Sequence, residues 1–174
     1  MKNGMLLVFT LVVSQIALGS EALTTDEEEI RQVFSSLTEA WRNADGEAWG
    51  MHFVEDADFT VWFGLELKGR EAIAAGHQYI FDGVYANTAF ELEVRQLRPI
   101  GTNVSVAHLR GYVVNDGEER PEEPDAVPVA VLQRVDDGWK LVTFHNTANI
   151  VEELGESIPL ETFKQLVADA TGGK

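Results

Sequence analysis

The sequence contains no cysteine. A chain without cysteine has no disulfide framework, no thiolate nucleophile and no cysteine-based metal site. Positively charged residues are also scarce, because 13 Lys and Arg stand against 29 Asp and Glu, for a formal net charge of −16. Phosphate binding requires clustered cations. The charge balance therefore argues against a nucleic-acid partner, and it disfavours tight docking on anionic lipid.

A long apolar run occurs only at the N-terminus. Lys2 supplies a positive start, residues 5–18 are nearly all apolar, and small residues follow. This order is typical of a secretory signal peptide, and the run is short for a membrane span. We therefore predict a signal peptide over residues 1–22, cleaved after Gly19 or Ala22. The protein would then be secreted or periplasmic, with no stable membrane span after cleavage.

The stretch after this segment predicts a helix over residues 25–43. Thr25 and Glu28 have the spacing of a capping box, and acidic residues in this turn place negative charge at the positive end of the helix dipole. Apolar side chains then recur at the spacing of one helix face. They are Ile30, Val33, Phe34, Leu37 and Trp41.

Two further helices are predicted in the first half of the chain. A short second helix carries Trp49 and Phe53 on one side, and a brief strand over residues 59–63 follows it. A third helix runs over residues 70–81. On its apolar stripe, His77 occupies a position where a core aliphatic residue is expected.

Strand signals dominate the second half of the chain. Residues 88–98 and 104–114 alternate in polarity, which is typical of half-buried strands in an antiparallel sheet. Residues 129–147 contain two apolar runs joined by the Asp-Gly pair at 137–138, which is a strong hairpin signal. Helices followed by a run of antiparallel strands predict one α+β domain, over residues 23–150.

Two other segments are predicted. Residues 115–125 are acidic and contain two prolines, and we interpret them as a solvated loop because their spacing matches no calcium-binding loop. Residues 151–174 predict a C-terminal helical tail that begins near Pro159. This tail could cover either the interior of the domain or the sheet.

Several short motifs occur in a characteristic order and spacing. They are EAWRNAD (39–45), FVEDADF (53–59), KGREAI (68–73) followed by His77, RPIG (98–101), GWKLV (138–142) and HNT (145–147). In these motifs the chain resembles the nuclear transport factor 2-like (NTF2-like), or SnoaL-like, superfamily, from about residue 27 to residue 150. Within it, the chain is most similar to SgcJ/EcaC-type proteins, which are DUF4440-like.

The resemblance implies both a fold and a kind of ligand. The implied fold is a cone-shaped roll in which three N-terminal helices pack on a curved antiparallel sheet, with an additional C-terminal helix. A small-molecule ligand or substrate inside the cone and a homodimer are also implied. No cofactor is expected, since the sequence carries no Gly-rich dinucleotide turn and no flavin or metal signature.

The superfamily contains isomerases, dehydratases, cyclases and epoxide hydrolases, and also members that only bind ligands or partners. On alignment with ketosteroid isomerase, the general base of that enzyme falls at Val61 and its oxyanion-hole tyrosine falls near Leu37. Neither Val61 nor Leu37 can perform those roles, so the sequence disfavours isomerisation by that mechanism. Histidines are the remaining candidates for acid–base catalysis, because histidine titrates near neutral pH. The candidates are His77, His108 and His145. The alternative is that each is a structural residue with its hydrogen bonds satisfied.

Further residues are candidates for the pocket lining. His145 and Asn146 alternate along one strand, so only one of them can face inward, and the sequence leaves both possibilities open. Asp58 could orient a histidine or cap a strand, and a buried Arg110 would need an anion. The predicted ligand-binding residues are Trp41, Phe53, Asp58, Trp62, Phe81, Arg110, Tyr112 and Asn146. No metal ligand is predicted.

Two functions from different classes agree with these observations. The first is a cofactor-independent enzyme of isomerase, cyclase or hydrolase type, in which a histidine moves a proton on an apolar substrate. The second is a non-catalytic ligand-binding or dimerisation module. The absence of a paired acid–base motif favours the second function, and analogy with the superfamily favours the first.

Overall fold

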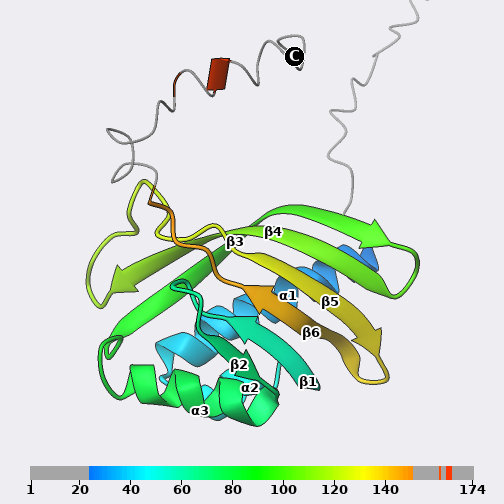
Figure 1. The fold of residues 1–174 in the computed structure, drawn as a ribbon, viewed down its shortest axis with the longest axis horizontal. Helices are drawn as coiled ribbons and strands as arrows, with labels where there is room; N and C mark the ends of the chain where they lie inside the picture. Colours follow the sequence, from blue (N-terminus) through cyan, green and yellow to red (C-terminus); the bar gives the residue numbers. More distant parts are fainter. Residues whose placement is uncertain (1–23, 151–160, 162–163, 166–174) are drawn as a thin grey trace, which may run out of the picture.

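The computed structural model describes residues 24–150, 161 and 164–165 (Figure 1). Residues 161, 164 and 165 are helical. The predicted signal peptide and the rest of the predicted C-terminal helix lie outside the described residues. In chain order the elements are α1 Thr25–Arg42, α2 Gly46–Gly50, β1 Phe53–Thr60, β2 Glu66–Lys68, α3 Arg70–Phe81, β3 Thr88–Ile100, β4 Val104–Asn115, β5 Val129–Val135 and β6 Gly138–His145. Within the described ranges, no helix is long and apolar enough to cross a membrane.

The strands of residues 24–150 form one sheet in the order β2-β1-β6-β5-β4-β3. Neighbouring strands are antiparallel except β1 and β6, which run parallel. The predicted α+β class is confirmed, but the sheet is mixed rather than wholly antiparallel. The parallel pair is possible because β1 and β6 are far apart in the chain, so no hairpin dictates their relative direction.

The helices pack on the sheet and enclose one hydrophobic core. α1 lies against β3 and also contacts β6, whereas α3 lies beside β1 and β2 (Figure 1). A register shift between Val94 and Gln96 marks an irregularity in β3, and such bulges bend a strand. The predicted apolar stripe of α1 faces the core. Its residues Ile30, Val33, Phe34, Leu37 and Trp41 are all buried.

Helix α1 begins at a capping box one residue earlier than predicted. The Glu27 backbone N–H donates to Thr24 Oγ1 (3.3 Å), and the Thr24 N–H donates to a Glu27 carboxylate oxygen (3.0 Å). The predicted pair, Thr25 and Glu28, lies inside the helix. Spacing alone could not separate the two pairs, because each has a threonine followed three residues later by a glutamate.

The first strand differs most from the prediction. β1 spans residues 53–60, so Phe53 lies in the sheet rather than on the second helix. Residues 61–65 form a turn in which Gly64 adopts φ +93°, a conformation that favours glycine. The helix prediction for Phe53 came from its position four residues after Trp49. That spacing fits a helix face, but tertiary pairing with β6 decided the conformation.

Helices α2 and α3 cross at close range because α2 begins with a glycine. A Cβ atom on Gly46 would lie 2.6 Å from the Ala74 carbonyl oxygen and 2.8 Å from the Gln78 backbone nitrogen. The Gly46 N–H also donates to the Gln78 side-chain oxygen (3.0 Å). The position of α3 therefore depends on the absence of a side chain at residue 46.

We expect Gly46→Ala to lower the free energy of unfolding by about 1–3 kcal/mol, because the added methyl group meets backbone atoms that cannot rotate away. Urea denaturation of the two proteins measures this difference. Gly83→Ala is the matched control, since a Cβ atom there comes no closer than 3.5 Å to the Tyr79 carbonyl oxygen. Equal stability of the two variants would contradict the prediction.

Candidate functional site

A cavity of about 370 Å³ opens where α1, the inner face of β3 and β4, and the segments before β5 and after β6 meet. Four aromatic side chains form one part of its lining, and polar side chains form another. Its volume lies in the range that holds a small organic molecule. The lining residues are Trp41, Trp62, Tyr85, Phe90, Val113, Asp125, Ala126, Asn146, Ala148, Asn149 and Ile150.

The Trp41 indole is held in place by a hydrogen bond and by ring contacts. Its Nε1 donates to Thr88 Oγ1 (2.9 Å), and that hydroxyl donates to the Tyr85 carbonyl (2.8 Å). Four rings surround the indole at centroid distances from 5.0 to 5.4 Å. They belong to Trp49, Phe81, Tyr85 and Phe90. Trp41, Tyr85 and Phe90 are therefore held by contacts within the protein, whereas Trp62 is half exposed and contacts the exposed ring of Phe63.

Phe90 reaches the cavity because β4 carries a glycine beside it. A Cβ atom on Gly111 would lie 2.3 Å from the Phe90 ring. Thr38 Oγ1 donates to the Phe90 carbonyl (3.0 Å) and so ties β3 to α1. The ring of Phe90 therefore occupies space that any larger residue at position 111 would fill.

The polar part of the lining comes from two segments that are hydrogen-bonded to each other. The Asn149 N–H donates to the Asp125 carbonyl (2.8 Å), and Asn149 Nδ2 donates to the Pro124 carbonyl (2.9 Å). Asp125 Oδ2 accepts from the Val113 N–H of β4 (2.7 Å). Residues 115–123 of the acidic loop are exposed, as the solvated-loop prediction expects. The end of the loop is anchored to the sheet, and there it supplies Asp125 to the cavity.

Asn146 lines the cavity, whereas its neighbour His145 does not. The Asn146 N–H donates to the Thr60 carbonyl (2.9 Å), which places it beside the end of β1. Its side-chain Oδ1 is buried and has no hydrogen-bond partner among the described residues. His145 is exposed, in agreement with the alternation of side chains along a strand. A buried polar atom without a partner is rare in native proteins, and a ligand would satisfy it.

His77 lies behind the aromatic lining of the cavity. Its side chain is 3 % exposed, and its Nδ1 lies 2.7 Å from the Ile73 carbonyl oxygen, so Nδ1 carries the proton that is donated. The ring stacks on Trp49 (4.5 Å) and meets Phe59 edge-on (4.8 Å). Burial lowers the pKa of His77 to about 4, because the apolar surroundings disfavour the charged form. His77 is therefore neutral at physiological pH.

Three predicted site residues of β4 face away from the cavity. His108, Arg110 and Tyr112 lie on the outer face of the sheet, because the alternating residues Ala107 and Leu109 face the core. His108 is exposed there. The expectation that His77 and His108 approach one interior is not met, since the sheet separates them.

Tyr112 is buried by partners on the outer face. Its hydroxyl donates to Glu93 Oε2 (3.3 Å), and the Arg120 guanidinium carbon lies 4.2 Å from the centre of its ring. The hydrogen bond from Arg95 holds the pKa of the Glu93 carboxyl below its usual value. Tyr112 thus packs the loop of residues 115–125 against the sheet and does not line the cavity.

Asp58, Phe53 and Phe81 also lie away from the cavity lining. Asp58 is part of β1 and forms an exposed ion pair with Lys68 of β2 (2.7 Å). Phe53 and Phe81 are buried in the core. Of the predicted ligand-binding residues, the structure places three at the cavity, namely Trp41, Trp62 and Asn146.

The sequence prediction missed several lining residues. Phe90 and Val113 belong to apolar strand faces, and periodicity does not separate a core residue from a residue that lines a cavity. Tyr85 and Asn149 lie in segments without periodicity, so no sequence signal marked them. One signal for Asp125 is its position at the end of the acidic loop, four residues before the predicted strand that begins at Val129.

Comparisons with known proteins agree with this architecture. The family model described as the SnoaL-like domain matches residues 30–149, which is most of the chain. The chain belongs to the SnoaL-like domain family. The match does not distinguish SgcJ/EcaC-type proteins from other members, so that finer assignment stays a prediction. A search of curated proteins finds no match.

Solved structures resemble the SnoaL-like domain over most of their length. A domain of unknown function with a cystatin-like fold from Nostoc punctiforme PCC 73102 is 29% identical, with a TM-score of 0.68 over 87% of this chain and 98% of that chain. An NTF2-like protein with a cystatin-like fold from Novosphingobium aromaticivorans is 24% identical, with a TM-score of 0.57 and coverages of 71% and 81%. An uncharacterised protein with a cystatin-like fold from Caulobacter vibrioides is 15% identical, with a TM-score of 0.65 and coverages of 80% and 99%. The last two show the fold alone.

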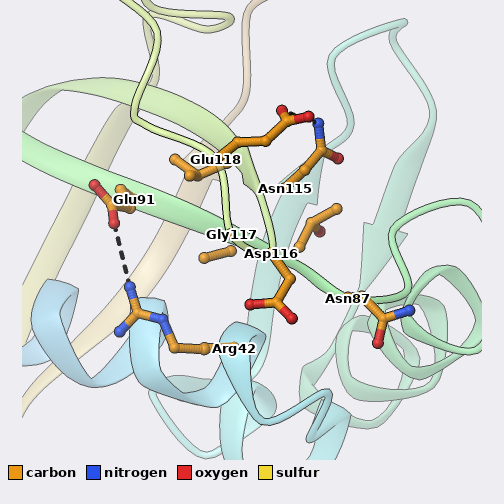
Figure 2. A pocket seen from close by; sticks show the side chains of 10 residues that line it. Arg42, Asn87, Glu91, Asn115, Asp116, Gly117 and Glu118 are labelled. Carbon is orange, nitrogen blue, oxygen red and sulfur yellow. Dashed lines mark hydrogen bonds and ion pairs between the residues drawn. The ribbon is translucent and has the colours of Figure 1, made fainter.

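The SnoaL-like domain carries other pockets. One of about 390 Å³ is largely polar, and Figure 2 shows the Asp116 carboxylate pointing into it near the ion pair of Arg42 with Glu91 (3.2 Å). Another, of about 400 Å³, lies beside Trp139 at the start of α1. In the part of the chain that the structure describes, no group of three or more His, Cys, Asp or Glu is placed to hold a metal ion. The pocket beside Trp139 also borders a buried atom without a hydrogen-bond partner among the described residues, the indole Nε1. The cavity beside Trp41 is the stronger candidate, because four aromatic side chains line it next to Asn146 Oδ1, whereas Trp139 is the one aromatic residue among the described residues that line the other pocket.

We expect the SnoaL-like domain to lose stability as the pH falls, because His77 is buried in its neutral form. The unfolded imidazole titrates near its ordinary pKa of 6.5, and the folded one titrates at about 4. Between these values the unfolded chain binds a proton that the folded chain does not. The free energy of unfolding should therefore fall by roughly 3 kcal/mol as the pH drops from 6.5 to 4.

Urea denaturation across this pH range measures the effect. His77→Phe keeps an aromatic ring and removes the titration, so its stability should depend less steeply on pH. A smaller slope of the same sign should remain, because burial, followed by the Lys140 charge, also lowers the pKa of His52. Ile30→Val is the control, because it changes the buried core without removing a titratable group, and it should keep the slope of the unmodified chain. An unchanged slope in His77→Phe would refute the assignment.

Proposed function

We propose that this SnoaL-like domain binds a small, apolar, ring-bearing molecule in the cavity beside Trp41. The observation that carries the proposal is an aromatic lining next to a buried polar atom without a partner among the described residues, Asn146 Oδ1. Aromatic side chains stack on ring systems, and a few polar groups fix the orientation of a ligand. Because Trp41 and Phe90 are already held by protein contacts, binding would cost little ordering of the lining.

The geometry supports binding without histidine-dependent catalysis. None of the described residues that line the cavity is a histidine. His77 is buried behind the aromatic lining, and both His108 and His145 are exposed elsewhere. A general base has to come within hydrogen-bond reach of the proton it removes. Of the two functions considered from the sequence, the non-catalytic ligand-binding module therefore has the stronger support.

Two further predictions concern where the protein is located and whether it forms a dimer. The N-terminal sequence supports export, with cleavage after Gly19 or Ala22. The resemblance to the superfamily supports a homodimer, formed through the outer face of the sheet, where Val129 and His108 are exposed. Mass spectrometry of the exported protein identifies the mature N-terminus. Light scattering during size-exclusion chromatography measures the mass of the particle in solution.

We expect Val113→Phe to weaken binding of a two-ring aromatic probe such as 2-naphthol by at least about tenfold, because the larger ring fills part of the cavity. Equilibrium dialysis measures the dissociation constant. Val84→Phe is the matched control, since it makes the same substitution at an exposed position that does not line the cavity. Equal affinity in Val113→Phe and in the unmodified chain would rule out this cavity as the binding site.

The chemical fate of a bound molecule separates a binding module from an enzyme. We expect mass spectrometry of the protein, purified without added ligand, to detect a co-purifying apolar compound. After prolonged incubation with fresh protein, this compound should be recovered chemically unchanged. Its conversion into a product, abolished by heat denaturation of the protein, would overturn the non-catalytic function.

A further inference from the structure

The polar part of the cavity lining offers hydrogen-bond acceptors. Asp125 contributes a carboxylate, one oxygen of which accepts from the Val113 N–H (2.7 Å). Asn149 Nδ2 donates a hydrogen bond to the Pro124 carbonyl (2.9 Å). The other polar atom of the Asn149 side chain, Oδ1, is a hydrogen-bond acceptor. Asn146 adds its buried Oδ1, which lacks a hydrogen-bond partner in the described part of the chain. A ligand that enters the cavity therefore meets acceptors along this part of its lining.

Positive charge does not balance these acceptors. The described residues that line the cavity include no Lys, Arg or His. Trp62 and Tyr85 carry an indole N–H and a hydroxyl, and such neutral donors do not cancel a full negative charge. Glu122 and Glu123 precede Asp125 in the sequence, and the whole chain has a net charge of −16. An anionic ligand would lose hydration in this cavity without gaining a counter-charge.

We propose that the cavity selects ring-bearing molecules that carry a hydroxyl or amine donor, and that it rejects carboxylates and phosphates. The rings pack on the aromatic lining, and the donor satisfies Asn146 Oδ1. Phenols, hydroxylated polycyclic compounds and aromatic amines belong to this class. This inference rests on the proposed ligand-binding function and adds to it the polarity of the ligand.

Three probes with the same two fused rings test this selectivity. 2-Naphthol carries a hydrogen-bond donor, 2-methylnaphthalene replaces it with a methyl group of similar size, and 2-naphthoate carries a negative charge. Equilibrium dialysis of the full chain near neutral pH measures the three dissociation constants. We expect 2-naphthol to bind about 3- to 10-fold more tightly than 2-methylnaphthalene, which is the usual effect of one neutral hydrogen bond. 2-Naphthoate should bind more weakly than either.

Variants of Asn146 identify the recognising atom. Asn146→Leu has a similar shape but no acceptor, so it should remove the preference for 2-naphthol while 2-methylnaphthalene still binds. Asn146→Asp retains an acceptor and adds negative charge, so it should keep that preference and weaken 2-naphthoate further. Circular dichroism verifies the fold of each variant. If the Asn146→Leu variant does not fold, the effect of Asn146→Asp on 2-naphthoate binding still tests whether this side chain contacts the ligand.

The possible outcomes separate the selectivity from the proposed function. Binding of 2-naphthoate as tightly as 2-naphthol would overturn the selectivity and leave the binding function intact. A preference for 2-naphthol that persists in a folded Asn146→Leu variant would overturn the role of Asn146. Failure of the unmodified chain to bind any of the three probes would overturn the binding function, and the selectivity with it.

Discussion

The packing of Trp41 is the contact on which both the core and the cavity depend. Its indole contacts four aromatic rings at 5.0 to 5.4 Å, and its Nε1 donates to Thr88 at the start of β3. Trp41 lines the cavity, and His77 lies 6.1 Å away in the core. Because one side chain serves both regions, ordering of the core also orders the binding surface. This arrangement is a form of preorganisation, in which folding supplies the order that binding would otherwise require.

Two glycines and one histidine allow the aromatic side chains of the core to pack closely. Gly46 lets α2 approach α3, and Gly111 leaves space for the Phe90 ring, so each removes a clash that even a methyl group would create. His77 adds a polar ring whose Nδ1–H is satisfied within its own helix by the Ile73 carbonyl. Its low pKa keeps it neutral, so the core contains no buried charge at this position. The cavity is a space that the close packing of these side chains leaves unfilled.

The elements with strong periodicity could be predicted from the sequence, but the orientation of β4 could not. The pattern correctly grouped His108 with Tyr112 on one face of the strand and Leu109 on the other. Both faces are rich in apolar residues, so polarity did not indicate which one faces the core. The structure directs Leu109 inward and leaves His108 exposed. Gly111 lies on the same inner face as Leu109 and leaves the space that the Phe90 ring occupies. The sheet therefore separates exposed His108 on β4 from His77, which lies on α3 in the core.

The sequence by itself determined the α+β class, the helices over residues 25–43 and 70–81, and the hairpin at 137–138, because each depends on local spacing and turn chemistry. Tertiary structure alone decided the parallel pairing of β1 with β6 and the choice of Asn146 over His145 at the cavity. It also decided that Asp125 joins the lining. These features arise from contacts between residues far apart in the chain, and no local pattern encodes such contacts.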